Sequence, residues 1–577
     1  MFLLLLQLAC SHKVKVDTAS PDLLYFILVD RFANGDINND VLVDTSDPQA
    51  FHGGDLKGVT QNLDHIQALG ADAIWLSPIY QMRTTKFHGH GAFHGYWTED
   101  LGTIAPLMGG EADLKELTGD MDERNMSLIL DVVYNHTSFD APLRSEQPDW
   151  FHPDRTIEDW NDPVQLTTYQ VHGLPDLDQS NPDVYKYLLD NSRKWLELPS
   201  VLGLRVDAIR HMDNEFLKRI NADLDTDNAW LLGEDFQGNP IANIDRFKQT
   251  DIDALFDFPF YYALTNSICD GQSFEEMASI LSLDSYYPEG SHLVRFLDNH
   301  DLPRILSRCG GDKAAVLLSE FILFGIRGTP MISYGTEQWS TGSDEPDNRR
   351  DMDWEKIDPD HVTHISTLSE FRKQFPTLKE GIPEIIHASQ DQLIVSQALG
   401  TERSMLLLNR STGPMDIPLE ECGGAFQVLQ GGLTLGMNNP SGFNATTPLF
   451  YPERLPNLNA LDFVLPAPKQ VSANSAMIVI CKTQKPEPSV QTVTINIDGD
   501  EGKSPRLVGS LPELGGWNPN NGVTTTWTGE HWRAEVTLPA HKVSAFKLVY
   551  QTDNGFQWED GGNRFLYSDT DKPIWIR

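Results

Sequence analysis

The sequence predicts an α/β fold, a (β/α)8 barrel, from the spacing of four short polar segments. Each segment sets carboxylates beside Arg, His, Asn or Gly at or near the end of an apolar run; they are residues 131–136, 203–207, 233–235 and 297–301. A βα unit takes roughly 30 residues, and barrel enzymes carry their catalytic groups at the carboxyl ends of the strands. Asp207 and Glu234 are one such unit apart, and Glu234 and Asp301 about two. Three carboxylates are therefore expected over one barrel mouth.

The strands expected of this barrel are short apolar runs without alternation, as in buried parallel sheets. The clearest are residues 22–29, 73–76, 128–133 and 330–334. Helical stretches separate them, which gives the strand and helix alternation of a parallel sheet. The barrel is expected to span residues 17–377, with a small inserted domain at about 138–178.

Two β-rich domains are expected after the barrel. From residue 378 to 481 the chain shifts to β-favouring runs such as 392–396 and 404–408, typical of an antiparallel domain. Residues 482–489 form a short polar linker with two prolines, expected to hold the next module semi-rigidly apart. Residues 490–577 alternate as strands and predict a separate β-sandwich.

Composition narrows the function classes. The 577 residues are 40% hydrophobic and 22% charged, which is ordinary globular material with room for several cores. The formal net charge of -39 argues against nucleic acid as a partner, because phosphate affinity comes from clustered Lys and Arg. A neutral polysaccharide carries no such penalty.

Residues 1–16 are expected to be an export segment, because the chain begins with a short apolar run that ends in a small residue before Cys10. The run resembles a bacterial lipoprotein segment, which would leave Cys10 lipidated and anchor the protein at the cell surface. No Lys or Arg precedes the run, so plain secretion and a misplaced start codon stay open. The other cysteines are Cys269, Cys309, Cys422 and Cys481, and they could pair in three ways or remain buried thiols.

The ordered set of motifs resembles the α-amylase superfamily, glycoside hydrolase family 13, across about residues 22–481. Flanking patterns at 53–56, 94–97, 174–178 and 328–337 belong to the same resemblance. It implies double displacement with retention, in which Asp207 is the nucleophile, Glu234 the general acid and base, and Asp301 a third acid that holds sugar hydroxyls. Retaining enzymes hold their two carboxyl groups about 5 to 5.5 Å apart, so that separation is expected between Asp207 and Glu234.

Further residues are expected around these acids. Arg205 lies two residues before Asp207, so both point to one face of a strand and the guanidinium can keep the carboxylate ionised. By resemblance His136 and His300 hydrogen-bond the sugar and Tyr96 stacks on it. The alternative for such residues is an ion pair or core position that only holds loops. Arg349 is a further sugar-binding candidate, ambiguous because Arg350 is adjacent.

A calcium loop is predicted at residues 34–40, where closely spaced oxygen side chains around a glycine turn suit a hard cation. The loop resembles that of cyclodextrin glycosyltransferases and related amylases. This implies ligands from Asn34, Asp36, Asn39, Asp40, the carbonyl of Gly53, and Asp55. A solvated turn is the alternative.

The resemblance implies a second calcium between the barrel and the inserted domain, held by Asn135, Asp176 and the carbonyl of His211. Asn135 and Asp176 could instead hydrogen-bond loop backbone. His88 and His90 are spaced like a metal pair, but their glycine-rich loop favours solvated histidines.

The last segment resembles the starch-binding module of carbohydrate-binding family 20. The resemblance assigns Trp517 and Trp558 as indoles that stack on glucose rings, with Lys547 and Asn563 hydrogen-bonding hydroxyls. A flat indole suits a sugar, which has apolar faces and polar edges. Trp532 is expected in the core.

The function expected from these residues is an endo-acting α-amylase, secreted or lipid-anchored, that cleaves α-1,4 bonds in starch, glycogen or maltooligosaccharides as a calcium-binding monomer. A cyclodextrin glycosyltransferase-like or maltogenic enzyme is the alternative suggested by the calcium loop, although no extra domain precedes the starch-binding module. A non-catalytic starch-binding surface protein is the alternative from another class, against which the intact acids argue.

Overall fold

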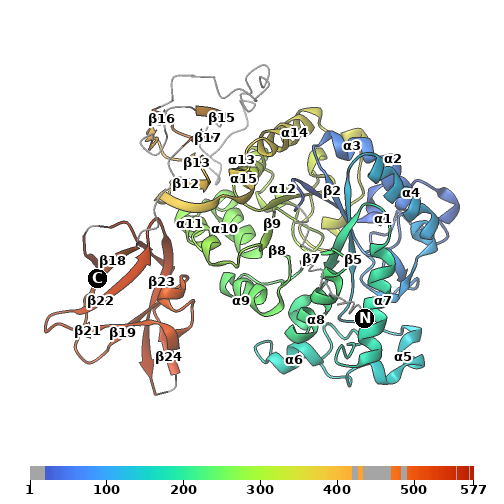
Figure 1. The fold of residues 1–577 in the computed structure, drawn as a ribbon, viewed down its shortest axis with the longest axis horizontal. Helices are drawn as coiled ribbons and strands as arrows, with labels where there is room; N and C mark the ends of the chain where they lie inside the picture. Colours follow the sequence, from blue (N-terminus) through green and yellow to red (C-terminus); the bar gives the residue numbers. More distant parts are fainter. Residues whose placement is uncertain are drawn as a thin grey trace, which may run out of the picture.

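The computed structural model describes residues 20–418, 426–432, 469–482, 490–553, 555–570 and 572–576. The expected export segment with Cys10, residue Cys422 and linker residues 483–489 lie outside this part. A barrel, a β domain and a C-terminal module follow one another along the chain (Figure 1). In the part of the chain that is described, no helix has the length and apolar character needed to cross a membrane.

Eight parallel strands close into a barrel in the order β1-β10-β9-β8-β7-β6-β5-β2. Their bounds are β1 Leu24–Ile27, β2 Ala73–Leu76, β5 Ser127–Val132, β6 Val201–Val206, β7 Trp230–Gly233, β8 Ala254–Phe256, β9 His292–Phe296 and β10 Thr329–Ser333. The four predicted runs coincide with β1, β2, β5 and β10. Both β1 and β2 are buried at every residue, which explains why their sequences do not alternate.

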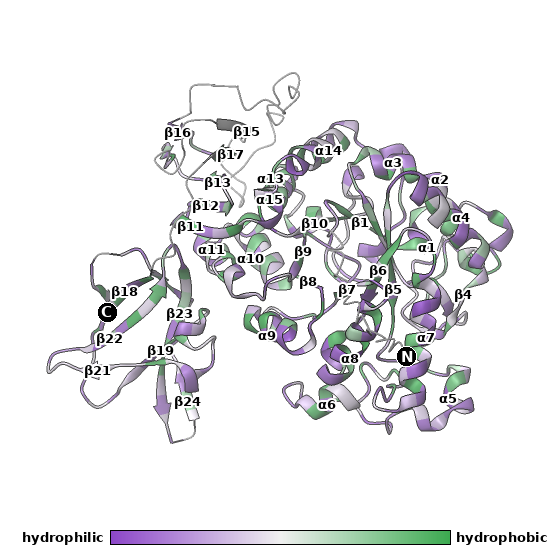
Figure 2. Ribbon diagram, viewed as in Figure 1, coloured by the Kyte–Doolittle hydropathy of each residue, from purple (hydrophilic) through white to green (hydrophobic). Residues whose placement is uncertain are grey.

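Helices alternate with the strands and surround the barrel (Figure 1). They are α1 Val29–Phe32, α2 Leu56–Gln61, α3 Leu63–Ala68, α4 Gly110–Glu123, α7 Pro182–Leu196, α8 Asn214–Asp225, α9 Pro240–Thr250, α10 Phe258–Cys269, α11 Phe274–Leu281, α12 Ile305–Arg308, α13 Lys313–Gly325, α14 Pro359–Lys373 and α15 Thr377–Glu380. Outer helices such as α4 and α14 carry both hydrophobic and hydrophilic stretches (Figure 2), as expected for helices with one face on a sheet.

Two excursions lie on the carboxyl side of the strands. A small hairpin, β3 (Tyr80–Met82) with β4 (Thr98–Ile104), stands between β2 and β5. A longer insertion between β5 and α7 contains α5 (Pro142–Glu146) and α6 (Pro163–Thr168). An isolated bridge between His136 and Asp176 ties its end back to the strand.

The β domain after the barrel is a five-stranded antiparallel sheet in the order β11-β12-β13-β17-β15. The strands are β11 Ile382–Ala388, β12 Gln392–Leu399, β13 Glu402–Asn409, β15 Phe426–Gly432 and β17 Ser475–Lys482, with a separate small pair, β14 Met415–Asp416 and β16 Gln470–Val471. Leu406 and Ile478 pack on α13 at Gly325, where a Cβ would lie 3.0 Å from Ile478. A disulfide joins Cys269 to Cys309 within the barrel domain, which settles that pairing.

The C-terminal module contains two sheets, β21-β22-β18-β26 and β20-β19-β23-β24, with β25 paired to β23. Its strands are β18 Val490–Ile497, β19 Pro505–Gly509, β20 Val523–Thr524, β21 Thr526–Trp527, β22 Trp532–Pro539, β23 Val543–Thr552, β24 Gly555–Trp558, β25 Arg564–Tyr567 and β26 Ile574–Ile576. Trp532 lies in the core, as expected, and its indole Nε1 donates to the carbonyl of Asp500 at 3.1 Å.

The expectation that the linker holds this module apart is wrong. Ile244 of α9 and Leu283, just beyond α11, belong to the same hydrophobic cluster as the module core. The amide of Val543 donates to Oγ of Ser282 at 2.9 Å, and the Tyr286 hydroxyl donates to Glu513 at 2.8 Å. The module therefore docks on the barrel through a shared apolar cluster and through hydrogen bonds between the two domains.

Candidate active site

The strand ends bring the predicted acids to one cavity. Asp207 follows β6, Glu234 follows β7, and Asp301 lies in the loop after β9. All three line a cavity of about 730 Å3 at the barrel mouth. The separation between the carboxyl groups of Asp207 and Glu234 stays a prediction.

Arg205 joins the acids from within β6. Its Nη1 lies 2.7 Å from Oδ1 of Asp207 and 2.9 Å from Oδ1 of Asp131. Its Nη2 lies 2.6 Å from Oε1 of Glu234, an ion-pair distance, but the atoms are out of line for a hydrogen bond. The guanidinium is fully buried, so one cation neutralises part of the charge of three carboxyl groups in a site shielded from water.

The surroundings of the three predicted acids shift their pKa values by different amounts and not all in the same direction. Burial raises the pKa of Glu234 to about 7, against the opposing effect of Arg205 and with help from the Asp207 charge. Burial also raises the pKa of Asp207, although Arg205 lowers it as expected from the sequence. Burial acts upward on Asp301 as well, but the charges of His300 and Arg349 outweigh it and lower the pKa of that carboxyl.

Asp301 differs from the other two in its exposure. It is enclosed by the walls of the cleft, yet 35% of its side chain is open to the cavity. Nη2 of Arg349 donates to it at 3.0 Å, and Nε2 of His300 lies 3.0 Å away. Asp301 therefore stays ionised, while Glu234 can hold a proton near neutral pH.

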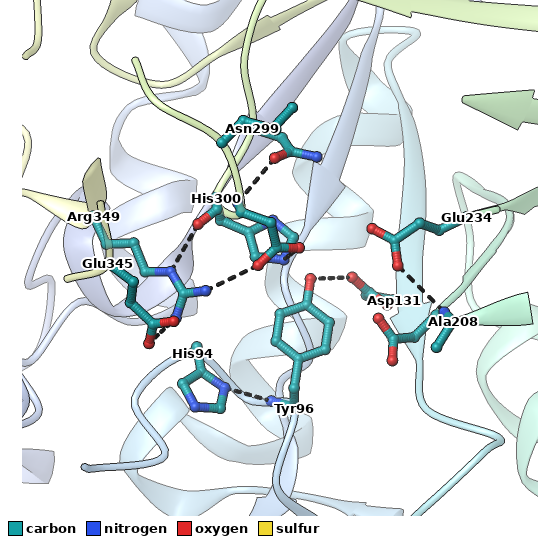
Figure 3. Close-up of polar contacts among 12 residues, drawn as sticks. His94, Tyr96, Asp131, Ala208, Glu234, Asn299, His300, Glu345 and Arg349 are labelled. Atoms are coloured by element: carbon teal, nitrogen blue, oxygen red, sulfur yellow. Dashed lines mark hydrogen bonds and ion pairs between the residues drawn. The ribbon is translucent and has the colours of Figure 1, made fainter. Parts of the chain in front are cut away.

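Asp131 also belongs to this cluster, although no role was assigned to it from the sequence. It lies in β5, directly beside Arg205 in the register of the two strands. The Tyr96 hydroxyl donates to Oδ2 of Asp131 at 2.8 Å (Figure 3), and the indole of Trp75 donates at 3.1 Å. Burial raises the pKa of Asp131 to about 8. The sequence signal for this residue was an acid at the end of an apolar strand. In the structure Asp131 holds the side chains of Arg205 and Tyr96 in position.

The sugar-side candidates line the same cavity. The rings of Tyr96 and His300 stack with centroids 4.8 Å apart and planes 10° apart, and His136 also lines the cavity. Of the two adjacent arginines, Arg349 is buried and donates to the carbonyl of His300 at 2.8 Å (Figure 3), whereas Arg350 is exposed. The structure thus places Arg349 in the cavity.

Several lining residues were not assigned from the sequence. They include His94, Trp160, His172, Phe236 and Glu345. Phe236 and Trp160 are aromatic residues that are 39% and 44% exposed, a signal of a sugar-stacking surface that the sequence alone does not distinguish from core. His90 lines this cavity, and both His88 and His90 are exposed. In the described residues no three side chains of His, Cys, Asp or Glu are arranged to hold a metal ion, so a cation site there would depend partly on amide and backbone oxygens.

The predicted calcium loop presents oxygens that lack partners. Oδ1 of Asn39 and Oδ1 of Asp40 are buried and accept no hydrogen bond in the described part of the chain. A Cβ on Gly53 would lie 2.7 Å from Oδ1 of Asp40, so this backbone is held close to the loop. Asn34 donates its amide to Asp40 at 2.8 Å and would have to flip to present oxygen. These oxygens fit a hard cation.

Asp36 and Asp55 of the same set are occupied by local hydrogen bonds. Asp55 caps α2, accepting from the amides of Gly58 at 2.7 Å and Gly35 at 3.0 Å. Asp36 accepts from the amide of Asn38 at 3.0 Å. Each carboxylate still has acceptor capacity, because an ionised carboxylate offers about four lone-pair sites.

The second predicted calcium set is less complete. Oδ1 of Asn135 is buried and has no hydrogen-bond partner among the described residues, whereas Asp176 accepts from Nδ1 of His152 at 2.7 Å. His211 contributes its ring to the active-site cavity, and its Nδ1 lies 3.0 Å from the carbonyl of Leu166. Asn135 is therefore the ligand whose environment fits best.

The module holds its four predicted residues together. Trp517 and Trp558 lie with ring centroids 6.2 Å apart, and Trp558 is 37% exposed. Nζ of Lys547 donates to the carbonyl of Gly561 at 2.7 Å, and Asn563 is exposed beside it. All four line one cavity.

Comparison with known proteins agrees with this geometry. The family described as alpha amylase, catalytic domain, matches residues 26–375, and the starch binding domain family matches residues 490–573. The first match spans more than half of the chain. The chain belongs to the alpha-amylase family. It is accordingly a glycoside hydrolase with a starch-binding domain, and its ligands are carbohydrates.

Individual relatives carry several activities. A cyclomaltodextrin glucanotransferase of Klebsiella oxytoca is 26% identical and aligns with 95% of this chain and 92% of its own. A cyclomaltodextrinase of a Bacillus species is 29% identical over 67% of this chain and 72% of its own. The crystal structure of an Anoxybacillus alpha-amylase, 29% identical, covers 80% of this chain and 98% of its own with a TM-score of 0.68.

Proposed function

We propose that this protein is a retaining, endo-acting α-amylase that hydrolyses α-1,4-glucosidic bonds of starch and related glucans. The observation that carries the proposal is one open cavity lined by Asp207, Glu234 and Asp301, in which the buried Arg205 contacts the first two and Arg349 contacts the third. Burial raises the pKa of Glu234 to about 7, which suits a proton donor, whereas the charges of His300 and Arg349 lower the pKa of Asp301, which suits an ionised group that binds sugar hydroxyls.

In this proposal Asp207 attacks the anomeric carbon while Glu234 gives its proton to the leaving oxygen. Burial raises the pKa of Asp207, and Arg205 opposes that rise, which favours the ionised nucleophile. Burial keeps the proton on Glu234 up to about pH 7. Glu234 then takes a proton from water, which hydrolyses the glycosyl ester. Ionised Asp301 accepts hydrogen bonds from sugar hydroxyls, which are most useful when the oxocarbenium-like state develops.

We also propose that the loop of residues 34–40 holds a calcium ion. The support is the pair of buried oxygens on Asn39 and Asp40 that lack partners in the described structure. Asn34, Asp36, Gly53 and Asp55 surround them. The ion would cross-link this loop to the start of α2 and would take no part in the chemistry.

Transglycosylation is the second candidate, because the glucanotransferase of Klebsiella oxytoca aligns along nearly the whole chain. Only seven residues, 483–489, separate the end of β17 from the start of β18, so no further domain stands between the β domain and the module. That arrangement favours hydrolysis as the first proposal.

A product time course with soluble starch tests the proposal. Mixed linear oligosaccharides should form early and should be absent with Asp207→Asn. Cyclic or transfer products would favour the transferase, and a lack of products with normal starch binding would contradict an active enzyme.

A further inference from the structure

The docked module turns its sugar site toward the barrel. The glycine turn that carries Trp517 packs on α9, since a Cβ on Gly516 would lie 3.2 Å from Ile241. On the other side, Tyr286 and Ser282, which follow α11, hydrogen-bond to Glu513 and Val543 of the module. Helices α9 and α11 therefore flank the module at its sugar-binding edge.

A cavity of about 600 Å3 lies between the two domains, within the 300 to 1,000 Å3 typical of ligand sites. The module contributes the two indoles, Lys547 and Asn563 to its lining. The barrel contributes Asn239 at the start of α9 and Glu276 and Ser279 of α11. The module's sugar site thus has a second wall that belongs to another domain.

Glu276 is the barrel group best suited to hold a ligand there. It is half-buried, and burial raises the pKa of its carboxyl. Its side chain makes no hydrogen bond or ion pair that we find in the described structure, unlike its neighbour Glu275, which pairs with the Tyr567 hydroxyl. A carboxylate that is only partly removed from water still has open acceptor sites, and sugar hydroxyls are suitable donors for a charge-assisted hydrogen bond.

The position of this cavity also links it to the active site. Phe236 lines the catalytic cavity, and Asn239, at the other end of the same short loop, lines the interdomain cavity. The two sites are therefore joined by one continuous segment that begins at Glu234.

We propose that the glucan site of the module is a two-walled cleft in which Glu276 of the barrel accepts hydrogen bonds from the sugar that Trp517 and Trp558 stack on. The proposal rests on the proposed function only in that the ligand is an α-glucan. A cleft of this kind holds a single chain between its walls, and a bound chain contacts module and barrel at once.

Calorimetric titration of the full chain with maltoheptaose tests the proposal, in an Asp207→Asn background that prevents cleavage. The binding component that Trp558→Ala removes is assigned to the module. Glu276→Ala should weaken that component about tenfold, equivalent to about 1.4 kcal/mol. Glu276→Gln, which keeps one acceptor and the same shape, should give an intermediate loss. Glu123→Ala, at the end of α4 away from the module, is the matched control (Figure 1).

An affinity of Glu276→Ala within threefold of the parent would overturn the two-walled cleft, as would the absence of any component sensitive to Trp558→Ala. A melting temperature equal to that of the parent shows that the variants are folded. Starch hydrolysis by the protein with Asp207 intact is measured separately, so failure of the proposed activity is distinguishable from failure of this inference.

Discussion

Replacement of Arg205 by methionine should disable the enzyme through the protonation of its acids. The guanidinium contacts Asp207, Asp131 and Glu234 within 2.9 Å and is shielded from solvent, so its loss leaves three buried acids without their cation. An opposite charge at this range lowers a carboxyl pKa by roughly 1 to 3. Removal should therefore raise the pKa of Glu234 further above about 7 and raise that of Asp207 as well.

The loss of kcat/KM expected for Arg205→Met follows from the proposed roles of Asp207 as nucleophile and Glu234 as proton donor. Asp207 must be ionised, so a higher pKa removes active enzyme in the acidic range; a rise of about 2 costs about hundredfold in kcat/KM there, at 1.36 kcal/mol for each tenfold. Removing one partner of a buried ion pair also destabilises the fold by about 3 to 5 kcal/mol.

The assay is kcat/KM against pH with a nitrophenyl maltooligosaccharide, together with thermal unfolding. Arg205→Lys keeps the charge but lacks the planar fork that reaches several carboxyl groups, and should lie between the parent and Arg205→Met. Arg350→Met, which removes an exposed arginine, is the matched control. If both limbs of the profile stay in place and kcat/KM falls less than tenfold, the electrostatic account of Arg205 is wrong.

Three further predictions concern other parts of the molecule. In the parent enzyme kcat/KM should be lost as pH rises through about 7, because Glu234 gives up the proton it must donate; a basic limb that remains in Glu234→Gln would contradict this. Chelation by EDTA should lower the melting temperature by a few degrees, because a bound ion stabilises the fold by about 2.7 kcal/mol at 100 times its Kd. Adding calcium, but not magnesium, should restore it. An unchanged melting curve would argue against the loop site. Trp558→Ala should reduce the ratio of granular to soluble starch hydrolysis about tenfold, measured as reducing ends, because this half-exposed indole offers a flat stacking surface; an equal ratio would exclude it from granule binding.

The barrel and its three acids could be predicted because both depend on local patterns. Strands such as β2 are apolar throughout, and their spacing fixes where the next strand ends. Asp207 and Glu234 directly follow β6 and β7, so their meeting at one mouth needs no knowledge of side-chain packing.

Other features depend on contacts between distant segments. The role of Asp131 follows from the register that sets it opposite Arg205, and a single sequence does not specify register between neighbouring parallel strands. Arg349 is the buried last residue of the short helical turn Asp347–Arg349, and Arg350 follows it in an extended conformation, a difference that adjacent identical residues do not reveal.

The docking of the module was missed for the same reason. Ile244 is an ordinary apolar position on an amphipathic helix, and nothing local shows that its partner is the module and not the barrel. The polar, proline-bearing linker suggested that the two domains stay separate. Burial of apolar side chains of the barrel against the module stabilises the docked arrangement more than the stiffness of the linker opposes it.

Peptide mass mapping of a trapped intermediate tests the central claim most directly. The Glu234→Gln variant, given an activated maltosyl fluoride, should accumulate a glycosyl ester because the second step lacks its base. The account predicts the added sugar on Asp207. A sugar on another carboxylate, or turnover of the fluoride with an unmodified Asp207 and an inverted product, would contradict it.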